Sequence, residues 1–215
     1  MKYTSVIFDL DGTLCDTLRD IHASVNRTLA ALGYPERSFE HTRGGINRGS
    51  RHLIAHALPD DADEGTVMET LALYMKIYGE HLCDETVPYP GITPMLARLN
   101  AENIKLAVLS NKPDPLVKRL AEHCFPGIFD IAMGQGEYPV KPEPTAPLAI
   151  ACTLGVSTET VLFVGDSDVD VLTAHNAGMT AVGVTWGYRD RDVLVSAGAD
   201  HIISHPSEIY DIIKS

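Results

Sequence analysis

Two clusters of acidic residues hold the side chains most able to do chemistry in this chain. Asp9 and Asp11 are two positions apart, which puts both carboxylates on the same side of an extended chain. Gly12 then permits a turn that a side chain would obstruct. Taken alone, residues 9–13 also fit a solvated Asp-Gly turn or a calcium loop. An EF-hand is excluded because glycine falls at position four of the loop and not at position six.

The second acidic cluster is Gly165-Asp166-Ser167-Asp168-Val169-Asp170. The spacing predicts that Asp166 and Asp170, as i and i+4, stack on one face of an opening helical turn. One carboxylate there would suit the helix dipole, so capping is the alternative explanation. Three carboxylates within five residues repel one another unless a cation compensates them. A hard divalent cation with oxygen ligands, such as Mg²⁺, meets that need.

Two shorter polar segments stand between these clusters. Ser110-Asn111-Lys112 follows an apolar run, and Val140-Lys141-Pro142 precedes a helical pattern. Singly, Ser110 could cap a turn and Lys141 could be a surface lysine. Their positions favour a functional role over these structural ones, because each segment lies at the end of a predicted strand or a short loop beyond it.

Short apolar runs alternate with longer helical patterns along most of the chain. We predict strands at 3–8, 104–109, 128–132, 160–164, 180–184 and 200–203. We predict helices at about 113–124, 144–154, 168–177, 190–197 and 206–213. This alternation predicts a parallel sheet wrapped by helices, whose strands open at their carboxyl ends into a ligand crevice.

The segment after the first strand breaks that alternation. A helical stripe runs from Leu18 to Leu32 and stops at Gly33, and further helices are expected at 49–58 and 64–83, with no convincing strand before 104. Thr93 and Pro94 then fit the N-cap and first turn of the next helix. We therefore expect an α/β protein. Its core, residues 1–16 and 89–215, is a Rossmann-like doubly wound parallel sheet, and residues 17–88 are a small helical cap domain inserted after strand 1.

Composition narrows the class of partner. Seventeen basic and 29 acidic residues among 215 give a net charge of −12, which argues against a general nucleic-acid binder. The four cysteines form no C-x-x-C pair, so we expect them to be reduced. The N-terminal apolar run is too short for a signal peptide, and the longest charge-free stretch, 171–188, is unsuited to a membrane. We expect a cytoplasmic protein without membrane partners, and its oligomeric state stays open.

Together the four motifs resemble those of the haloacid dehalogenase superfamily, in its Mg²⁺-dependent phosphatase branch. They are D-L-D-G-T at 9–13, S-N-K at 110–112, K-P at 141–142 and G-D-S-x-x-D at 165–170. The resemblance covers essentially the whole chain, and the helical insert is similar to the small cap of that family. The segments around Gly178, 183–188 and 199–200 look most like those of the phosphoglycolate phosphatase group.

The resemblance implies a role for each motif residue. Asp9 would be the nucleophile that accepts the phosphoryl group, and Asp11 the acid and base that serves the leaving group and the water. Lys141 would neutralise both Asp9 and the phosphate. The residues implied to hold phosphate oxygens are Thr13, Ser110, Asn111 and Lys141. Those implied to bind Mg²⁺ are Asp9, Asp11 through its main-chain carbonyl, Asp166, and Asp170 mainly through water.

A basic stretch in the expected cap offers a candidate for substrate recognition. Residues 41–59 contain no acidic residue, although they include Arg48 and Arg51. One interpretation is a solvated basic helix face. The other is that Arg48 or Arg51 binds a second anionic group of the substrate, such as the carboxylate of phosphoglycolate.

We therefore expect a Mg²⁺-dependent phosphatase that acts on a small phosphorylated metabolite, with phosphoglycolate favoured, through an aspartyl phosphate. A β-phosphoglucomutase-like phosphosugar mutase, a pyrophosphatase and a broad sugar or nucleotide phosphatase are alternatives within the superfamily. A catalytically inactive module that binds phospho-metabolites is the alternative from another class.

Overall fold

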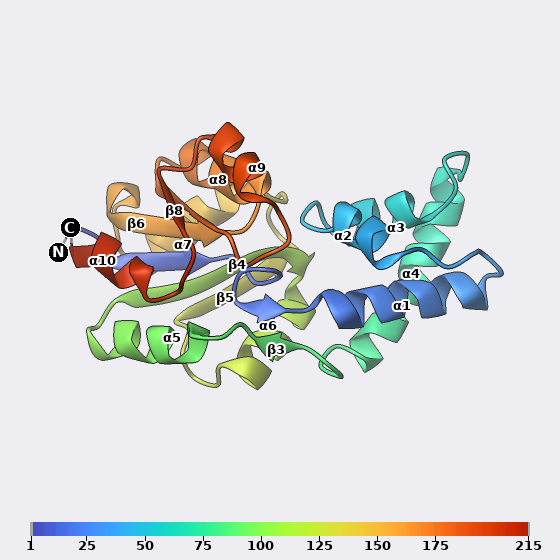
Figure 1. The fold of residues 1–215 in the computed structure, drawn as a ribbon, viewed down its shortest axis with the longest axis horizontal. Coiled ribbons are helices and arrows are strands. Elements are labelled where there is room, and N and C mark those ends of the chain that lie inside the picture. Colours follow the sequence, from blue (N-terminus) through green and yellow to red (C-terminus); the bar gives the residue numbers. More distant parts are fainter. Residues whose placement is uncertain (1, 215) are drawn as a thin grey trace.

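The computed structural model describes residues 2–214 and is shown in Figure 1. The strands are β1 (Ser5–Phe8), β2 (Cys15–Asp16), β3 (Val87–Pro88), β4 (Lys105–Pro113), β5 (Ile131–Gln135), β6 (Val161–Gly165), β7 (Thr180–Val184) and β8 (His201–Ile203). The α-helices are α1 (Leu18–Ala31), α2 (Phe39–Gly45), α3 (Ser50–Ala57), α4 (Glu64–Glu80), α5 (Ile92–Ala101), α6 (Asp114–Cys124), α7 (Thr145–Leu154), α8 (Asp168–Asn176), α9 (Arg191–Ala197) and α10 (Glu208–Lys214).

Six strands form one parallel sheet in the order β5-β4-β1-β6-β7-β8. β1 is central, and Phe8 at its end pairs with Val108 on one side and Val164 on the other. The chain winds outward from β1 to β5, then returns to β6 beside β1. In such sheets the crevice at the switch of direction lies at the carboxyl ends of the strands. The predicted fold class, a Rossmann-like parallel sheet wrapped by helices, is confirmed.

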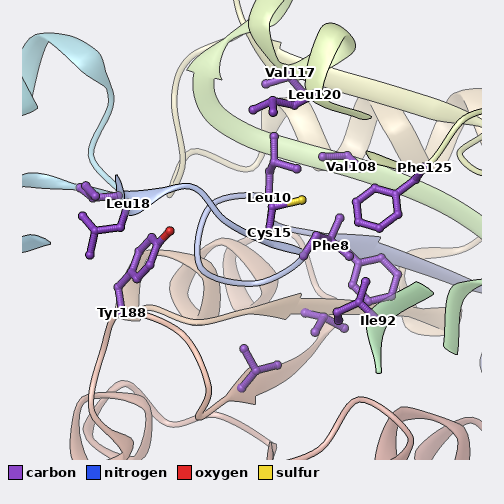
Figure 2. Close-up of a cluster of buried hydrophobic side chains, with 14 of the residues drawn as sticks. Phe8, Leu10, Cys15, Leu18, Ile92, Val108, Val117, Leu120, Phe125 and Tyr188 are labelled. Carbon is purple, nitrogen blue, oxygen red and sulfur yellow. The ribbon is translucent and has the colours of Figure 1, made fainter. Parts of the chain in front are cut away.

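The two faces of the sheet bury separate apolar clusters. Val6 and Phe8 of β1 face a cluster that includes residues of α5, α6 and α10, whereas Ile7 faces one built from α7, α8 and α9. This alternation follows from the two-residue repeat of a strand. Figure 2 shows the first cluster, in which Leu10 of the loop after β1 and Cys15 at the start of β2 contribute to the core. The loop that carries Asp9 and Asp11 is therefore anchored by its own apolar residues.

Helices α1 to α4, called the helical insert below, lie between β2 and β3 and project from one end of the sheet (Figure 1). β2 and β3 are antiparallel, with Cys15 opposite Pro88 and Asp16 opposite Val87, so the two connections to the insert run side by side. The expectation of no strand before residue 104 is wrong here. A two-residue strand shows no hydrophobic period in the sequence, and Pro88 is atypical of strands.

Several boundaries also differ from the sequence prediction, including β1, which begins at Ser5, and α4, which ends at Glu80. α5 begins at Ile92 with Gly91 as its N-cap, so Thr93 is not the cap; proline is tolerated throughout a first turn because those N–H groups lack helical partners. β5 begins at 131 and not at 128, because Ile128 and Phe129 pack against the core before the strand starts. β4 extends to Pro113 and includes the S-N-K motif. Within residues 2–214, no helix is both long and apolar enough to cross a membrane.

Candidate active site

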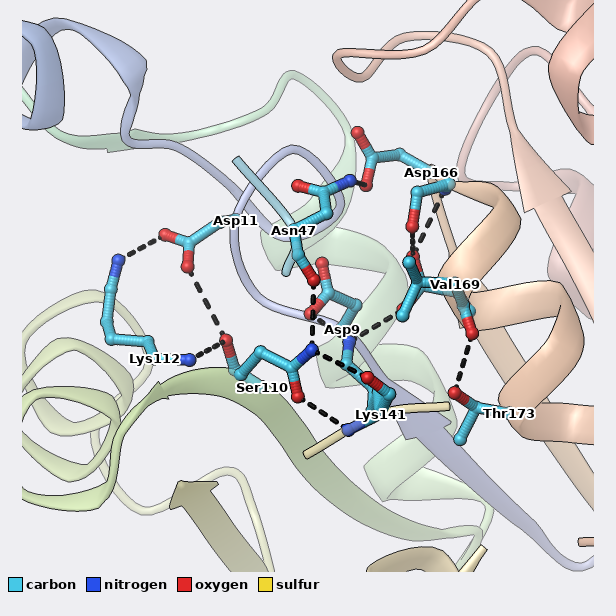
Figure 3. Close-up of polar contacts among 12 residues, drawn as sticks. Asp9, Asp11, Asn47, Ser110, Lys112, Lys141, Asp166, Val169 and Thr173 are labelled. Carbon is cyan, nitrogen blue, oxygen red and sulfur yellow. Dashed lines mark hydrogen bonds and ion pairs between the residues drawn. The ribbon is translucent and has the colours of Figure 1, made fainter. Parts of the chain in front are cut away.

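Residues from four distant segments meet at the carboxyl edge of the sheet (Figure 3). Asp9 and Asp11 follow β1, and Ser110 and Asn111 lie at the end of β4. Lys141 comes from the loop between β5 and α7, and Asp166 from the loop after β6. All of these side chains are buried. The sheet thus brings together the motifs that the sequence spreads over more than 150 residues.

Lys141 joins two of the carboxylates. Its Nζ donates to Oδ1 of Asp9 and to Oδ1 of Asp170, each at 2.6 Å. Burial raises the pKa of Asp9 to about 7, against the opposing effect of Lys141 and with the support of the Asp170 charge. Burial lowers the pKa of Lys141, but the Asp170 and Asp9 carboxylates outweigh it and hold this pKa above its ordinary value. Lys141 therefore carries the positive charge that this buried cluster requires.

Asp166 occupies a tight pocket between two glycines. A Cβ at Gly12, whose φ is +88°, would lie 2.4 Å from Oδ2 of Asp166, and a Cβ at Gly187 would lie 2.3 Å from its Cβ. The backbone N–H of Tyr188 donates to Oδ2 at 2.6 Å, and Asn47 Nδ2 donates to Oδ1 at 3.4 Å. Burial, followed by repulsion from Asp170 and Asp9, raises the pKa of Asp166 well above its ordinary value.

The predicted stacking of Asp166 and Asp170 on one helical turn is wrong. α8 begins at Asp168, so Asp166 lies in the loop before the helix. Asp170 is on the helix and accepts a hydrogen bond from the Ser167 N–H at 3.1 Å, which closes the first turn. Both carboxylates still face the same site. Capping and cation binding, which the sequence presented as alternatives, are compatible at Asp170.

The carboxylates fit a divalent cation. Oxygen atoms of Asp9, Asp166 and Asp170 all lie within 4.8 Å of one another, and all three side chains are buried. Burial and mutual repulsion raise the pKa values of Asp9 and Asp166 in spite of Lys141. A buried set of hard oxygen donors with excess negative charge is the arrangement that Mg²⁺ and similar cations prefer.

Asp11 points away from that cluster, toward the helical insert. Its Oδ1 accepts hydrogen bonds from Thr17 Oγ1, at 2.6 Å, and from Lys112 Nζ. Its Oδ2 accepts one from Ser110 Oγ at 3.4 Å. Asp9 and Asp11 thus lie in one loop but face different surroundings, the first a candidate cation site and the second the boundary with the insert.

The residues expected to hold phosphate take up different positions. Ser110 lines the cavity described below. Asn111 also lines it, but its side chain accepts from the Lys141 N–H at 2.7 Å and donates to the Lys141 carbonyl at 3.1 Å, which positions that lysine. Thr13 is buried and does not line the cavity, and its Oγ1 has no protein partner among the described residues.

A cavity of about 40 Å³ lies between the sheet edge and the insert. Asp9, Asp11 and Lys141 line it from the core, and Tyr74 and Tyr78 of α4 line it from the insert. The apolar side chains of Ile21, Ile46 and Leu53 complete the wall. A volume of this size holds only a few water molecules. The insert therefore covers the site closely.

Neither arginine proposed as a carboxylate binder lines this cavity. Arg48 pairs with Asp168 at 3.3 Å, and Arg51 pairs with Glu64 within the insert. Both side chains are more than half exposed. Arg48 thus reaches the edge of the 165–170 motif at Asp168, and neither arginine contacts Asp9, Asp11 or Lys141.

Several residues at the site were not predicted from the sequence. Lys112, Tyr78 and Asn47 line the cavity, and Asn111 Nδ2 donates to the Asn47 carbonyl at 2.9 Å. Lys112 belongs to the S-N-K motif, and its place beside Ser110 and Asn111 could have indicated that it lies at the site. The position of Asn47 has a weaker signal, namely the glycines at 44, 45 and 49 around it. Tyr78 carries no signal, because its helical spacing is that of a core residue.

Comparison with known proteins agrees with this geometry. The family model of haloacid dehalogenase-like hydrolases matches residues 6–184. A phosphoglycolate phosphatase of Chromobacterium violaceum is 33% identical over 217 residues, covering 98% of this chain and 96% of the relative. One of Pseudomonas putida is 37% identical over 190 residues, covering 85% and 70%. These relatives confirm the expected resemblance to the phosphoglycolate phosphatase group.

Solved structures show the same fold. A protein of Lactobacillus delbrueckii subsp. bulgaricus has a TM-score of 0.92 at 30% identity and covers 99% of both chains. CbbY of Rhodobacter sphaeroides, an aspartate-to-asparagine mutant in complex with xylulose 1,5-bisphosphate, has a TM-score of 0.81 at 25% identity and covers 96% of both chains. Because the family model spans most of the sequence and the motif residues gather in one pocket, this chain belongs to the haloacid dehalogenase-like hydrolases and is an enzyme of the hydrolase class expected from its motifs.

Proposed function

We propose that this enzyme is a Mg²⁺-dependent phosphatase that hydrolyses a small phosphomonoester through an aspartyl phosphate on Asp9, with phosphoglycolate as the favoured substrate. One observation carries the proposal. A carboxylate suited to attack phosphorus, Asp9, lies 2.6 Å from the Lys141 ammonium and within 4.8 Å of Asp166 and Asp170 ligand atoms. Asp11, a second carboxylate in the same loop, faces the side from which a leaving group would depart.

Two steps account for hydrolysis. An Asp9 oxygen forms a bond to phosphorus while the bond from phosphorus to the ester oxygen breaks, and Asp11 gives its proton to the departing alkoxide. Water then attacks the same phosphorus, Asp11 takes up a proton from it, and the bond to Asp9 breaks to release inorganic phosphate. Lys141 offsets the negative charge of Asp9 and of the transferring oxygens throughout.

Asp9, Asp166 and Asp170, with the main-chain carbonyl of Asp11, would hold the cation. When bound, Mg²⁺ would act as a Lewis acid that neutralises phosphate charge. The residues supply what remains. Asn111 keeps Lys141 in place through its two backbone hydrogen bonds, and Ser110 offers a hydroxyl at the cavity wall for a phosphate oxygen.

The helical insert would act as a cap that opens and closes. A phosphomonoester would enter between the insert and the sheet edge, so we expect the insert to move relative to the core during turnover. The paired β2 and β3 are the natural hinge. A division into a core of 1–16 and 89–215 and a cap of 17–88 agrees with this hinge and stays a prediction, as does a cytoplasmic location.

The small cavity favours a small substrate. Phosphoglycolate also suits the relatives, since those of Chromobacterium violaceum and Pseudomonas putida are named for it. CbbY, by contrast, was solved with a sugar bisphosphate. The mutase, the pyrophosphatase and the broader phosphatase therefore become competing outcomes of the same assay.

The test is phosphate release from phosphoglycolate, pyrophosphate, xylulose bisphosphate and β-glucose 1-phosphate, with Mg²⁺ and with chelator. We expect Mg²⁺-dependent release that is fastest for phosphoglycolate. Asp9→Asn should lower kcat by at least about 10³-fold, because it removes the attacking oxygen. Asp60→Asn, at an exposed aspartate of the insert, is the matched control and should retain activity.

Other outcomes would redirect or reject the proposal. Isomerisation of glucose 1-phosphate without phosphate release would identify a mutase. Binding of phosphorylated metabolites without any turnover would identify an inactive binding module. Full activity in Asp9→Asn would reject the aspartyl-phosphate route itself.

A further inference from the structure

Lys112 is a buried cation that the reaction described above does not use. Its side chain is 5% exposed, although lysine is among the residues least often buried. It lies at the end of β4, and its Nζ donates to Asp11 of the core and, at 2.8 Å, to the Tyr78 hydroxyl of the insert. Figure 3 shows it reaching Asp11 from the side opposite Asp9.

This ammonium has capacity for another acceptor. A lysine ammonium carries three N–H donors, and two are used by Asp11 and Tyr78. The third has no acceptor within residues 2–214. The Tyr78 hydroxyl accepts from Lys112, so its own hydrogen is free to donate as well. Both groups line the cavity, so two donors from opposite sides of the closed interface are available at one point of its wall.

Lys112 is also the cation of the cavity wall that stands apart from the proposed cation site. Lys141, the other lysine of the wall, is held by Asp9 and Asp170. Arg48 and Arg51 pair with carboxylates elsewhere and do not line the cavity. Lys112 is paired with one carboxylate and a neutral hydroxyl, whereas Lys141 is shared by two carboxylates, so a further negative charge on a bound substrate would be attracted more to Lys112. Without such a partner, a buried carboxylate would be strongly unfavourable.

The position of Lys112 suits the leaving group and not the phosphate. The ester oxygen that Asp11 protonates must come within about 2.7 Å of that carboxylate. Lys112 is in direct contact with Oδ1 of Asp11, so its Nζ lies within about 5.5 Å of the ester oxygen if that oxygen meets Oδ1 and both contacts have ordinary hydrogen-bond lengths. A carboxylate attached one carbon from the ester oxygen is then within reach of Nζ.

We propose that Lys112 and Tyr78 form the subsite that binds the carboxylate of the substrate's leaving group, and so select phosphorylated hydroxy acids over uncharged phosphate esters. The inference rests on the proposed phosphatase function and names the substrate class that the site prefers. It replaces Arg48 and Arg51, the candidates from the sequence, with a pair of residues that meet only when the insert closes. Closure and carboxylate recognition are then the same event.

Two substrates that differ only in the carboxylate test this subsite. Phosphoglycolate carries it, and ethyl phosphate has a methyl group in its place. For Lys112→Met we expect kcat/KM for phosphoglycolate to fall about 10- to 100-fold more than kcat/KM for ethyl phosphate, the range typical of a lost hydrogen bond to a charged group. Tyr78→Phe should reduce the same preference by a smaller factor. Lys112→Arg, which keeps the charge, should retain part of it.

Controls separate recognition from folding and from general catalysis. Lys105→Met removes an exposed lysine at the start of β4, remote from the site, and should leave the preference unchanged. The preference is a ratio, so a structural defect that slows both substrates equally does not alter it. If Lys112→Met failed to fold, Tyr78→Phe would decide, because it leaves the pairing of Lys112 with Asp11 intact.

Equal losses on the two substrates would overturn the proposal, as would a preference that disappears in an Arg48→Met/Arg51→Met double variant but not in Lys112→Met. A wild-type enzyme that hydrolyses both substrates equally well would refute the subsite while leaving the phosphatase function standing. A wild-type enzyme that releases phosphate from neither would instead refute the proposed function.

Discussion

Arg189, in the loop after β7, fastens the helical insert to the core. Its guanidinium donates to three carbonyls at the end of α2, those of Arg43 at 3.0 Å, Ile46 at 3.0 Å and Gly44 at 3.3 Å. Arg43 returns the contact by donating to the Tyr188 carbonyl at 2.7 Å. A cation at the end of a helix also interacts favourably with its dipole. Arg189→Ala should therefore weaken the closed conformation.

The expected size follows from these contacts. Hydrogen bonds with a charged partner contribute about 1.5–3 kcal/mol when buried, and Arg189 is half-buried, so its three bonds together should be worth about 2 kcal/mol to closure. That free energy corresponds to a change of roughly 30-fold in the ratio of closed to open molecules. Opening would separate Tyr78 and Asn47 from their partners in the core, so kcat/KM should fall by up to the same factor.

Steady-state phosphate release gives kcat/KM, and fluorescence reports closure separately. Trp186 is the only tryptophan of the chain and lies three residues before Arg189, so its emission should change with the loop. Arg191→Ala is the matched control, since Arg191 is exposed and two residues away. If Arg189→Ala kept kcat/KM within twofold of wild type, Arg189 would not stabilise the contact between insert and core. The same conclusion would follow if Arg191→Ala lowered kcat/KM as much as Arg189→Ala.

Two further predictions concern the cation site. Gly187→Ala places a Cβ 2.3 Å from Asp166 Cβ and from the Gly12 carbonyl oxygen, and such overpacking costs about 1–3 kcal/mol. The Mg²⁺ concentration for half-maximal activity should therefore rise about 10- to 100-fold. Gly79→Ala, at a helical position with open space around it, is the control and should not change that concentration. The pKa of Asp9 is raised to about 7 from an ordinary 3.8, so between these pH values the folded metal-free protein holds a proton that the unfolded chain has released. The stabilisation that comes from this bound proton is lost as pH rises from about 4 to 7. The increase in Tm caused by Mg²⁺ should therefore be larger at pH 8 than at pH 5, and a larger increase at pH 5 would contradict the assignment.

The sequence located the core motifs well because their positions depend on topology alone. Asp9, Ser110 and Asp166 each follow or end a strand that is nearly all apolar, and parallel strands bring their carboxyl ends to one edge of a sheet. Lys141 could be found in the same way, although it lies in a loop, because the loop is short and leads into α7. Such reasoning needs the order of the strands and no knowledge of side-chain packing.

Such reasoning fails where the helical insert meets the sheet edge. Arg48 and Arg51 lie in a basic stretch, yet their charges are taken up by Asp168 and Glu64, which no local pattern could reveal. Lys112 was part of a recognised motif, but its partner Tyr78 lies 34 positions earlier on the inner face of α4. The spacing of Tyr78 is that of a buried helical residue, and burial is what the structure shows. Its function comes from what is buried beside it.

On the proposed reaction, chemistry and selectivity would involve different sets of residues. Asp9, Lys141 and Asp170 are held by contacts within the core, whereas Lys112 binds Tyr78 of the insert. Asp11 lies at one of the contacts between the core and the insert, since Thr17, just before α1, and Lys112, which also binds Tyr78 of the insert, both donate to its carboxylate. A substrate that draws Lys112 toward its own charge would loosen one of these contacts at the moment Asp11 is needed. Binding of the leaving-group carboxylate would then change the hydrogen bonding of Asp11, and so its ability to give a proton to the ester oxygen.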